Sequence, residues 1–181
     1  MINNTTIAWN FHDAFNISSI FNKLERIGRN FLNVKTNPDG LEGSKRFVSD
    51  MIHNLNHQAI LSHFLITIVL QESPEHEEDR LTIQRYLTCF PGAVVNGNVI
   101  TMTLLGWRTF FKSEVEVSLS NEAIHFFAMD LACKFEKEIP IVFDDIASCY
   151  RVAHSHWAPA AGINKGKIAP MVHLSTTANM H

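Results

Sequence analysis

The sequence lacks the features that mark membrane-spanning and secreted proteins. No apolar run approaches the ~20 residues that a membrane-spanning helix needs, and Met1–Asn10 has neither the basic nor the apolar region of a signal peptide. The three cysteines are odd in number and widely spaced, at Cys89, Cys133 and Cys149. We therefore expect buried, reduced thiols in a soluble, cytosolic protein, with neither disulfides nor a zinc cluster.

Nucleotide-binding and metal-binding motifs are also missing. The glycines form no GxGxxG series, and GxxxxGK[ST] is absent. His154 and His156 alternate, which can place two imidazoles on one side of a strand, but no ExxH, HExxH or CxxC accompanies them. We expect no cofactor, no metal and no small-molecule substrate, and we interpret this histidine pair as part of a surface turn.

A nucleophilic site is the one catalytic arrangement that the residue types allow. Asp144, Asp145, Cys149 and His154 include a thiol, a base and groups that can orient the base. Closeness in sequence does not supply the geometry, and we expect Cys149 to face the core. The protein is therefore predicted not to be an enzyme.

The charge is small overall but unevenly placed. The net charge is −3, yet residues 23–46 hold six basic and three acidic side chains, and the chain from Arg151 onward holds three basic ones and no acid. Basic segments favour contact with anionic membranes or nucleic acids. The candidate binding residues for a membrane or a nucleocapsid are Lys23, Arg26, Arg29, Lys35, Lys45, Arg46, Lys165 and Lys167.

The central block predicts the sheet. Phe64–Leu70 is apolar at both alternate sets of positions, which is typical of a strand buried on both faces. Asn96-Gly97 supplies the positive φ values of a hairpin turn before a strand over Val99–Leu105. Arg108–Ser120 alternates apolar and polar residues, with Phe110 as the exception, and predicts a strand with one solvated face.

Several stretches have helical periodicity. We expect helices over Ile17–Phe31, from a cap at Ser44 to Ala59, over Leu81–Phe90 after a cap at Asp79, and over Glu122–Lys137 after a cap at Ser120 or Asn121. Little regular structure is expected over Met1–Asn16. We expect a short edge strand over Ile141–Phe143, followed by one or two helical turns through Tyr150.

These patterns predict an α+β fold, an antiparallel sheet of about four strands packed with three to four helices. Residues 1–43 are expected to form an N-terminal arm with an amphipathic basic helix, residues 44–152 a globular core, and residues 153–181 a flexible tail. The apolar stripe of the arm helix packs either on its own core or on the next subunit. The candidate self-association residues on this stripe are Ile20, Phe21, Leu24, Ile27 and Phe31.

The order of elements in the central block resembles the globular core of rhabdovirus matrix proteins. The resemblance rests on the strand Phe64–Leu70, the helix Leu81–Phe90, the turn Asn96-Gly97-Asn98 and the segment Val99–Leu105. It implies a viral structural protein, of a length found in plant-infecting viruses, that polymerises under the envelope. Many animal-virus members also carry a proline-rich budding motif and a lysine-rich leader, and Met1–Asn22 has neither proline nor lysine.

The resulting hypothesis is a matrix-like protein that self-associates and bridges ribonucleoprotein and an anionic membrane during virion assembly and budding. It would be found in the virion and in the host cytoplasm, peripheral on membranes. Two alternatives stay open. The first is a small intracellular enzyme, with a deep pocket holding at least two of His125, Asp144, Asp145, Cys149, His154 and His156. The second is a bacterial adaptor or effector that binds one protein partner.

Overall fold

The computed structural model describes residues 7–35, 40–116 and 121–155. Its centre is one antiparallel sheet of four strands in the order β1-β2-β4-β3: β1 (Trp9–Phe11), β2 (Leu65–Leu70), β3 (Val94–Asn96) and β4 (Val99–Thr103). The predicted α+β class is therefore confirmed. The longest pairing joins β2 to β4, from Leu65 opposite Thr103 to Val69 opposite Val99.

The predicted hairpin connects β3 to β4. Asn96 pairs with Val99, which leaves Gly97 and Asn98 as a two-residue loop. Only Gly97 of this loop has a positive φ, 56°, at the first central position, where a type II′ turn requires it. The turn is confirmed, although Asn96 does not supply a second positive φ as expected.

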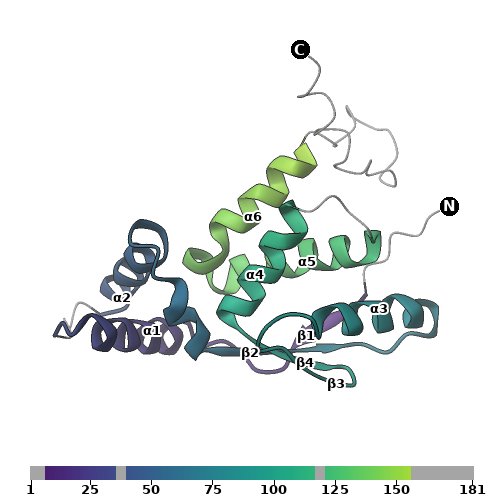
Figure 1. Ribbon diagram of the computed structural model, residues 1–181, viewed down its shortest axis with the longest axis horizontal. Coiled ribbons are helices and arrows are strands. Elements are labelled where there is room, and N and C mark those ends of the chain that lie inside the picture. Colours follow the sequence, from purple (N-terminus) through teal and green to yellow (C-terminus); the bar gives the residue numbers. More distant parts are fainter. Residues whose placement is uncertain (1–6, 36–39, 117–120, 156–181) are drawn as a thin grey trace, which may run out of the picture.

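Six α-helices accompany the sheet in the described part of the chain. They are α1 (Ile17–Leu32), α2 (Gly40–Ser49), α3 (Glu77–Leu87), α4 (Leu104–Glu116), α5 (Glu122–Glu138) and α6 (Pro140–Ser155). A π-helix, Asp50–Asn54, continues α2, and 3-10 helices cover Gln58–His63 and Pro74–His76. Figure 1 shows α1 and α2 beside the sheet and α3 to α6 on one side of it.

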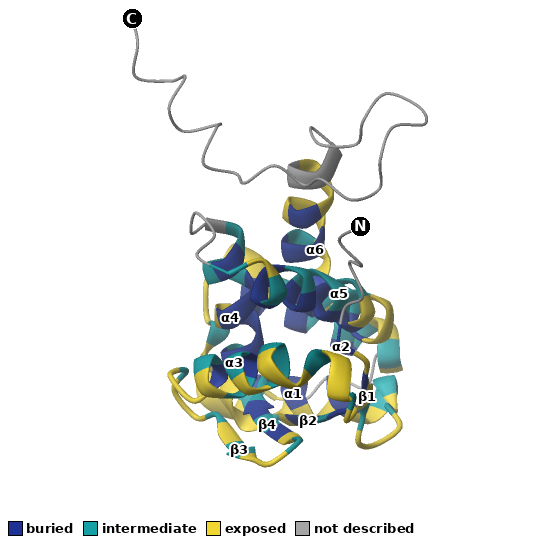
Figure 2. Ribbon diagram, turned by 90° about the vertical axis from the view of Figure 1, so that its right-hand side faces the viewer, coloured by how far each residue is buried: buried dark blue, intermediate teal, exposed yellow. Residues whose placement is uncertain are grey.

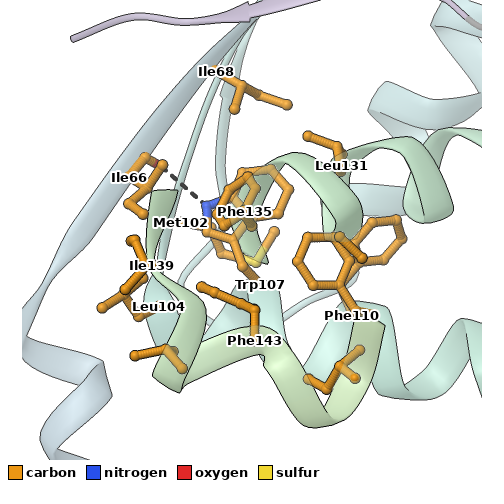
Figure 3. Close-up of a cluster of buried hydrophobic side chains, with 14 of the residues drawn as sticks. Ile66, Ile68, Met102, Leu104, Trp107, Phe110, Leu131, Phe135, Ile139 and Phe143 are labelled. Atoms are coloured by element: carbon orange, nitrogen blue, oxygen red, sulfur yellow. Dashed lines mark hydrogen bonds between the residues drawn. The ribbon is translucent and has the colours of Figure 1, made fainter. Parts of the chain in front are cut away.

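The helices cover only one face of the sheet. The inner side chains Ile66, Ile68, Ile100 and Met102 are buried against a core centred on Trp107. The Trp107 indole N–H donates to the carbonyl oxygen of Ile66 at 3.1 Å, and its ring lies among aromatic side chains from α4, α5 and α6 (Figure 3). The opposite face is open, because Leu65 is 60% exposed. The prediction that β2 is buried on both faces was wrong.

The predicted strand over Arg108–Ser120 was also wrong, because Leu104–Glu116 is helix α4. Leu104, Trp107, Arg108 and Phe111 are buried at positions i, i+3, i+4 and i+7, which is one helical face. Phe110, the exception to the strand pattern, is buried as well. Residues 117–120 lie outside the described part of the chain.

The ends of the chain are more regular than predicted. Trp9–Phe11 pairs with β2 as an edge strand, within a segment where little structure was expected. Pro140–Ser155 is one helix, with Pro140 at its start, where a missing N–H costs nothing. The expected edge strand over Ile141–Phe143 is therefore part of α6.

Two of the predicted helix caps differ from the structure, and one is correct. Ser44 lies inside α2, which begins at Gly40, and Asp79 lies inside α3, which begins at Glu77. Asn121 does cap α5, since its side chain accepts hydrogen bonds from the backbone N–H groups of Ala123 and Ile124 at 2.9 and 3.2 Å.

Candidate functional site

The C-terminal end of α1 is an exposed apolar surface. Asn33 ends the helix in the left-handed conformation (φ 53°), and the Val34 N–H donates to the Arg29 carbonyl oxygen at 3.0 Å, as in a Schellman motif. Phe31 is 67% exposed, Leu32 37% and Val34 47%. We call these three residues the α1 tip. Exposed apolar side chains so closely spaced are typical of a binding surface.

The segment around His57 contacts the α1 tip. The Phe31 ring centroid is 5.8 Å from that of His57, and Leu55, two residues before His57, is 52% exposed. The segment that follows the π-helix thus adds to the apolar surface contributed by α1.

Four of the candidate basic residues are exposed and take part in no ion pair with another described residue: Lys23, Arg26, Lys35 and Arg46. Lys23 lies 5.1 Å above the Phe64 ring. Lys45 is different, because its ammonium contacts Glu42 at 2.8 Å. Lys165 and Lys167 lie outside the described residues.

Arg29 has a structural environment. Its Nε donates to Glu25 at 2.6 Å, and one of its terminal N–H groups donates to the Lys35 carbonyl oxygen at 2.9 Å. The guanidinium lies 4.5 Å from the centre of the Phe47 ring. Arg29 therefore fixes the segment that follows α1, and it is not a free surface charge like Arg26.

A buried hydrogen-bond network joins α1 to α2. Glu25 and Ser44 are both buried, and the Ser44 hydroxyl donates to the Glu25 carboxylate at 2.5 Å. Asn22 Oδ1 lies 2.9 Å from the same hydroxyl. Because buried charges need partners, this network explains why α2 packs on α1 at this register.

The candidate self-association residues divide into two groups. Ile20, Phe21 and Leu24 are at most 2% exposed and belong to the core formed by the same chain. Ile27 is partly buried against that core, and Phe31 is exposed. The stripe of α1 therefore packs on its own chain here, and of these five residues only Phe31 presents a largely exposed side chain.

Asp144 and Asp145, the two acids of the nucleophilic arrangement that the sequence allows, line a shallow hollow. His53 and Ser148 line the same hollow. Its volume is about 300 Å³, which is at the lower end of the range for small-molecule sites. The His53 imidazole lies 3.9 Å from Asp144 and 3.0 Å from the Ile141 carbonyl oxygen. Cys149 is exposed, so the expectation that it faces the core was wrong.

Asp145 is engaged by a buried arginine. Arg108, 1% exposed, donates to both carboxylate oxygens of Asp145, one of them at 2.7 Å, and to the Val142 carbonyl oxygen at 2.5 Å. Burial alone would raise the pKa of Asp145, but its hydrogen bonds and charge attraction to Arg108 outweigh burial and lower the pKa. Asp145 is therefore held as a structural anion.

The remaining titratable candidates are dispersed. His125 is buried, with its ring 5.7 Å from that of Tyr150. Cys89 is exposed and Cys133 is partly buried, and burial raises the pKa of the Cys133 thiol. The thiols are free as expected, but the prediction that they are buried was wrong. The side chain of His154 and the whole of His156 lie outside the described part of the structure.

The described residues contain neither a metal-binding cluster nor a membrane-spanning helix. Across residues 7–35, 40–116 and 121–155, no group of three or more histidines, cysteines or carboxylates is placed to hold a metal ion. None of the described helices combines the length and apolar character needed to cross a bilayer.

Comparisons of the chain with protein-family models, with curated proteins and with solved structures found no match.

The strongest surface signals lie on residues that sequence patterns did not single out. Leu32, Val34 and Leu55 at the α1 end, and Leu65, Val94 and Val99 on the open face of the sheet, are all exposed. For Leu32 and Val34, the sequence signal that could have predicted an exposed apolar surface was their position just after the predicted end of the helix at Phe31. For the sheet, an apolar strand was interpreted as doubly buried, because sequence does not show which face the helices cover.

Proposed function

We propose that this protein is a matrix-like structural assembly protein. It self-associates, lies on an anionic membrane surface in the virion and in the host cytoplasm, and bridges that membrane to ribonucleoprotein during virion assembly and budding. The observation that carries the proposal is the α1 tip, where Phe31, Leu32 and Val34 are exposed. The exposed Lys35 follows it directly, and the exposed Arg26 precedes Phe31 on the same helix.

Chemistry supports a membrane as the partner of this end of the molecule. Phe31, Leu32 and Val34 offer apolar area that can enter the headgroup region, while Arg26 and Lys35 offer charges for anionic lipids. Each basic residue near an anionic surface contributes about 1 kcal/mol. The Phe47-stacked Arg29 holds Lys35 beside the helix end.

The bridging role also needs a contact with ribonucleoprotein. Lys23 and Arg46 are exposed and unpaired within the described chain, and they offer phosphate contacts in addition to any made by Lys165 and Lys167. Binding through so few charges is weak and salt-sensitive for one copy, and self-association multiplies it.

Flotation of the purified protein with anionic liposomes across a salt series tests the membrane step. We expect the double variant Arg26→Glu with Lys35→Glu to lose flotation, because repulsion replaces attraction. The matched control is Arg85→Glu with Lys137→Glu, which changes the net charge equally at exposed residues of α3 and α5 and is expected to float like the wild type.

Replacing Phe31 in the α1 tip separates the contribution of apolar insertion into the membrane from that of charge attraction. Phe31→Ser is expected to weaken flotation while leaving its salt dependence intact, since the basic residues remain. A wild-type protein that stays in the dense fraction at low salt would overturn the proposal, and so would equal loss in both charge variants.

A further inference from the structure

The open face of the sheet is the second exposed apolar surface of the molecule. Leu65 and Val94 are 60% and 62% exposed, which is close to the exposure of Phe31 in the α1 tip, and Val99 is 38% exposed. Figures 1 and 2 both show the strands at one side of the molecule, with the helices on the other side of the sheet. Leu65 also lines a hollow of about 220 Å³ together with residues 13–16 and the first turn of α1.

Strand register brings the outward side chains together. Val69 pairs with Val99, and Thr101 lies between Thr67 and Val94 in the next row. We call Leu65, Thr67, Val69, Val94, Val99 and Thr101 the outer face. In the same rows Asn10 lies beside Val69 and Asn96 beside Val99, at the two edges of the sheet, and Thr103 lies opposite Leu65. The two threonine hydroxyls bond to each other at 2.8 Å, so their hydrogen-bonding needs are largely met within the sheet and their methyl groups add apolar area.

The absence of charge on the outer face indicates which kind of partner it suits. None of its six side chains is charged. Two titratable residues lie at its edge: the His12 N–H donates to the Thr67 carbonyl oxygen at 2.9 Å, and Asp13 lines the same hollow as Leu65. An anionic membrane or a nucleic acid would require basic residues here. Under two-fold symmetry the same patch faces itself, so an uncharged patch meets no unpaired charge on a second copy.

The size of the outer face sets the strength of the contact. Six residues of β2 extend about 20 Å, and the three strands that carry the outer face, at a spacing of about 4.8 Å, span roughly 14 Å. The footprint, about 280 Å² per copy, is well below the ~800 Å² per partner of a standard interface. The contact alone is therefore weak, roughly micromolar or weaker.

We propose that two copies of this chain pack their outer faces together, sheet on sheet, as a weak two-fold dimer. The inference rests on the self-association that the proposed function includes, and it names the surface responsible. Aligned sheets of this kind pack with apolar side chains interdigitated about 10 Å apart.

Sedimentation equilibrium from micromolar to sub-millimolar concentrations tests the inference. The wild type is expected to show a concentration-dependent dimer, and Val99→Lys to remain a monomer. Leu81→Lys on α3 is the matched control, because Leu81 is also 38% exposed but lies away from the outer face, and it is expected to dimerise like the wild type.

A mixing experiment separates a face contact from general loss of folding. Val69→Lys/Val99→Lys and Val69→Glu/Val99→Glu are each expected to be monomeric, because two-fold packing opposes like charges. Mixed in equal amounts, they are expected to form a heterodimer. Circular dichroism and liposome flotation of each variant confirm that the fold and the α1 tip remain intact.

The outcomes distinguish this inference from the proposed function. A wild type that floats with liposomes but sediments as a monomer over the whole range would overturn the outer-face dimer and leave membrane binding standing. Dimers of Val99→Lys as strong as the wild type, or folded charge variants that do not pair on mixing, would also overturn it. A dimer that ignores liposomes would instead overturn the membrane proposal.

Discussion

Glu114 is a carboxyl group held inside the protein beside a phenol. It is 7% exposed, and the Tyr86 hydroxyl donates to it at 2.5 Å. Burial raises the pKa of Glu114, partly offset by the hydrogen bond from Tyr86, while burial and the nearby carboxyl raise the pKa of Tyr86 to about 12. The folded state therefore favours the protonated form of Glu114.

This environment predicts a pH-dependent stability. Because the pKa of Glu114 is higher in the folded than in the unfolded state, its favourable contribution is present at low pH and is lost as the pH rises through the raised pKa. Glu114→Gln removes the titration. We expect the free energy of unfolding of the wild type, relative to this variant, to fall between acidic and neutral pH in urea titrations. If the free energies of unfolding of the wild type and Glu114→Gln changed with pH in parallel, the raised pKa of Glu114 would be contradicted.

At the scale of elements, one ionic contact ties α4 to α6. Arg108 reaches from α4 to Asp145 and to the Val142 carbonyl oxygen on α6. The arginine is buried, whereas the Asp145 side chain is 38% exposed. Removing the anion leaves a buried cation without its counter-charge, which is among the more costly changes to a folded protein.

We expect Asp145→Asn to lower the free energy of unfolding by about 2–3 kcal/mol, measured by urea denaturation. The effect is expected to vanish at low pH, because the lowered pKa of Asp145 makes its contribution present above the ordinary pKa and lost as the pH falls through the lowered one. Asp144→Asn, at an exposed neighbour, is the control, with an expected change below about 0.5 kcal/mol. Equal effects of both variants would show that the pair is not the cause.

Elements with strong local signals were predictable. The periodicity of α1, the cap of α5 and the Asn96-Gly97 turn act within a few residues, and the structure has all three. Helix α4 was not predictable in this way, because Ser113, Val115 and Val117 continue an alternation that strands also use. Its helical state comes from tertiary contacts of Trp107 and Phe110, and tertiary context overrides local preference.

The candidate site was predictable only in part. Arg26, Lys35 and Phe31 were identified from charge and periodicity, and the structure places them on the surface. Arg29 followed the same pattern, but its pairing with buried Glu25 depends on how α2 packs. The outer face escaped prediction for a related reason, since an apolar strand does not show which of its sides the helices will cover.

At the scale of the whole molecule, the two exposed apolar surfaces lie at different places and carry different charge. The α1 tip is followed by Lys35 and shares its helix with Arg26, while the six side chains of the outer face are uncharged. The first suits an anionic membrane and the second suits another copy of the chain. A protein that uses both surfaces concentrates on a membrane and then associates there, because confinement raises the effective concentration of a weak contact.

The most direct test is a binding isotherm on anionic vesicles at fixed lipid and increasing protein. The account predicts a sigmoidal isotherm for the wild type, and a simple hyperbolic one for Val69→Lys/Val99→Lys, which keeps the α1 tip but cannot pair through the outer face. A hyperbolic isotherm for the wild type with the same midpoint as this variant would contradict it.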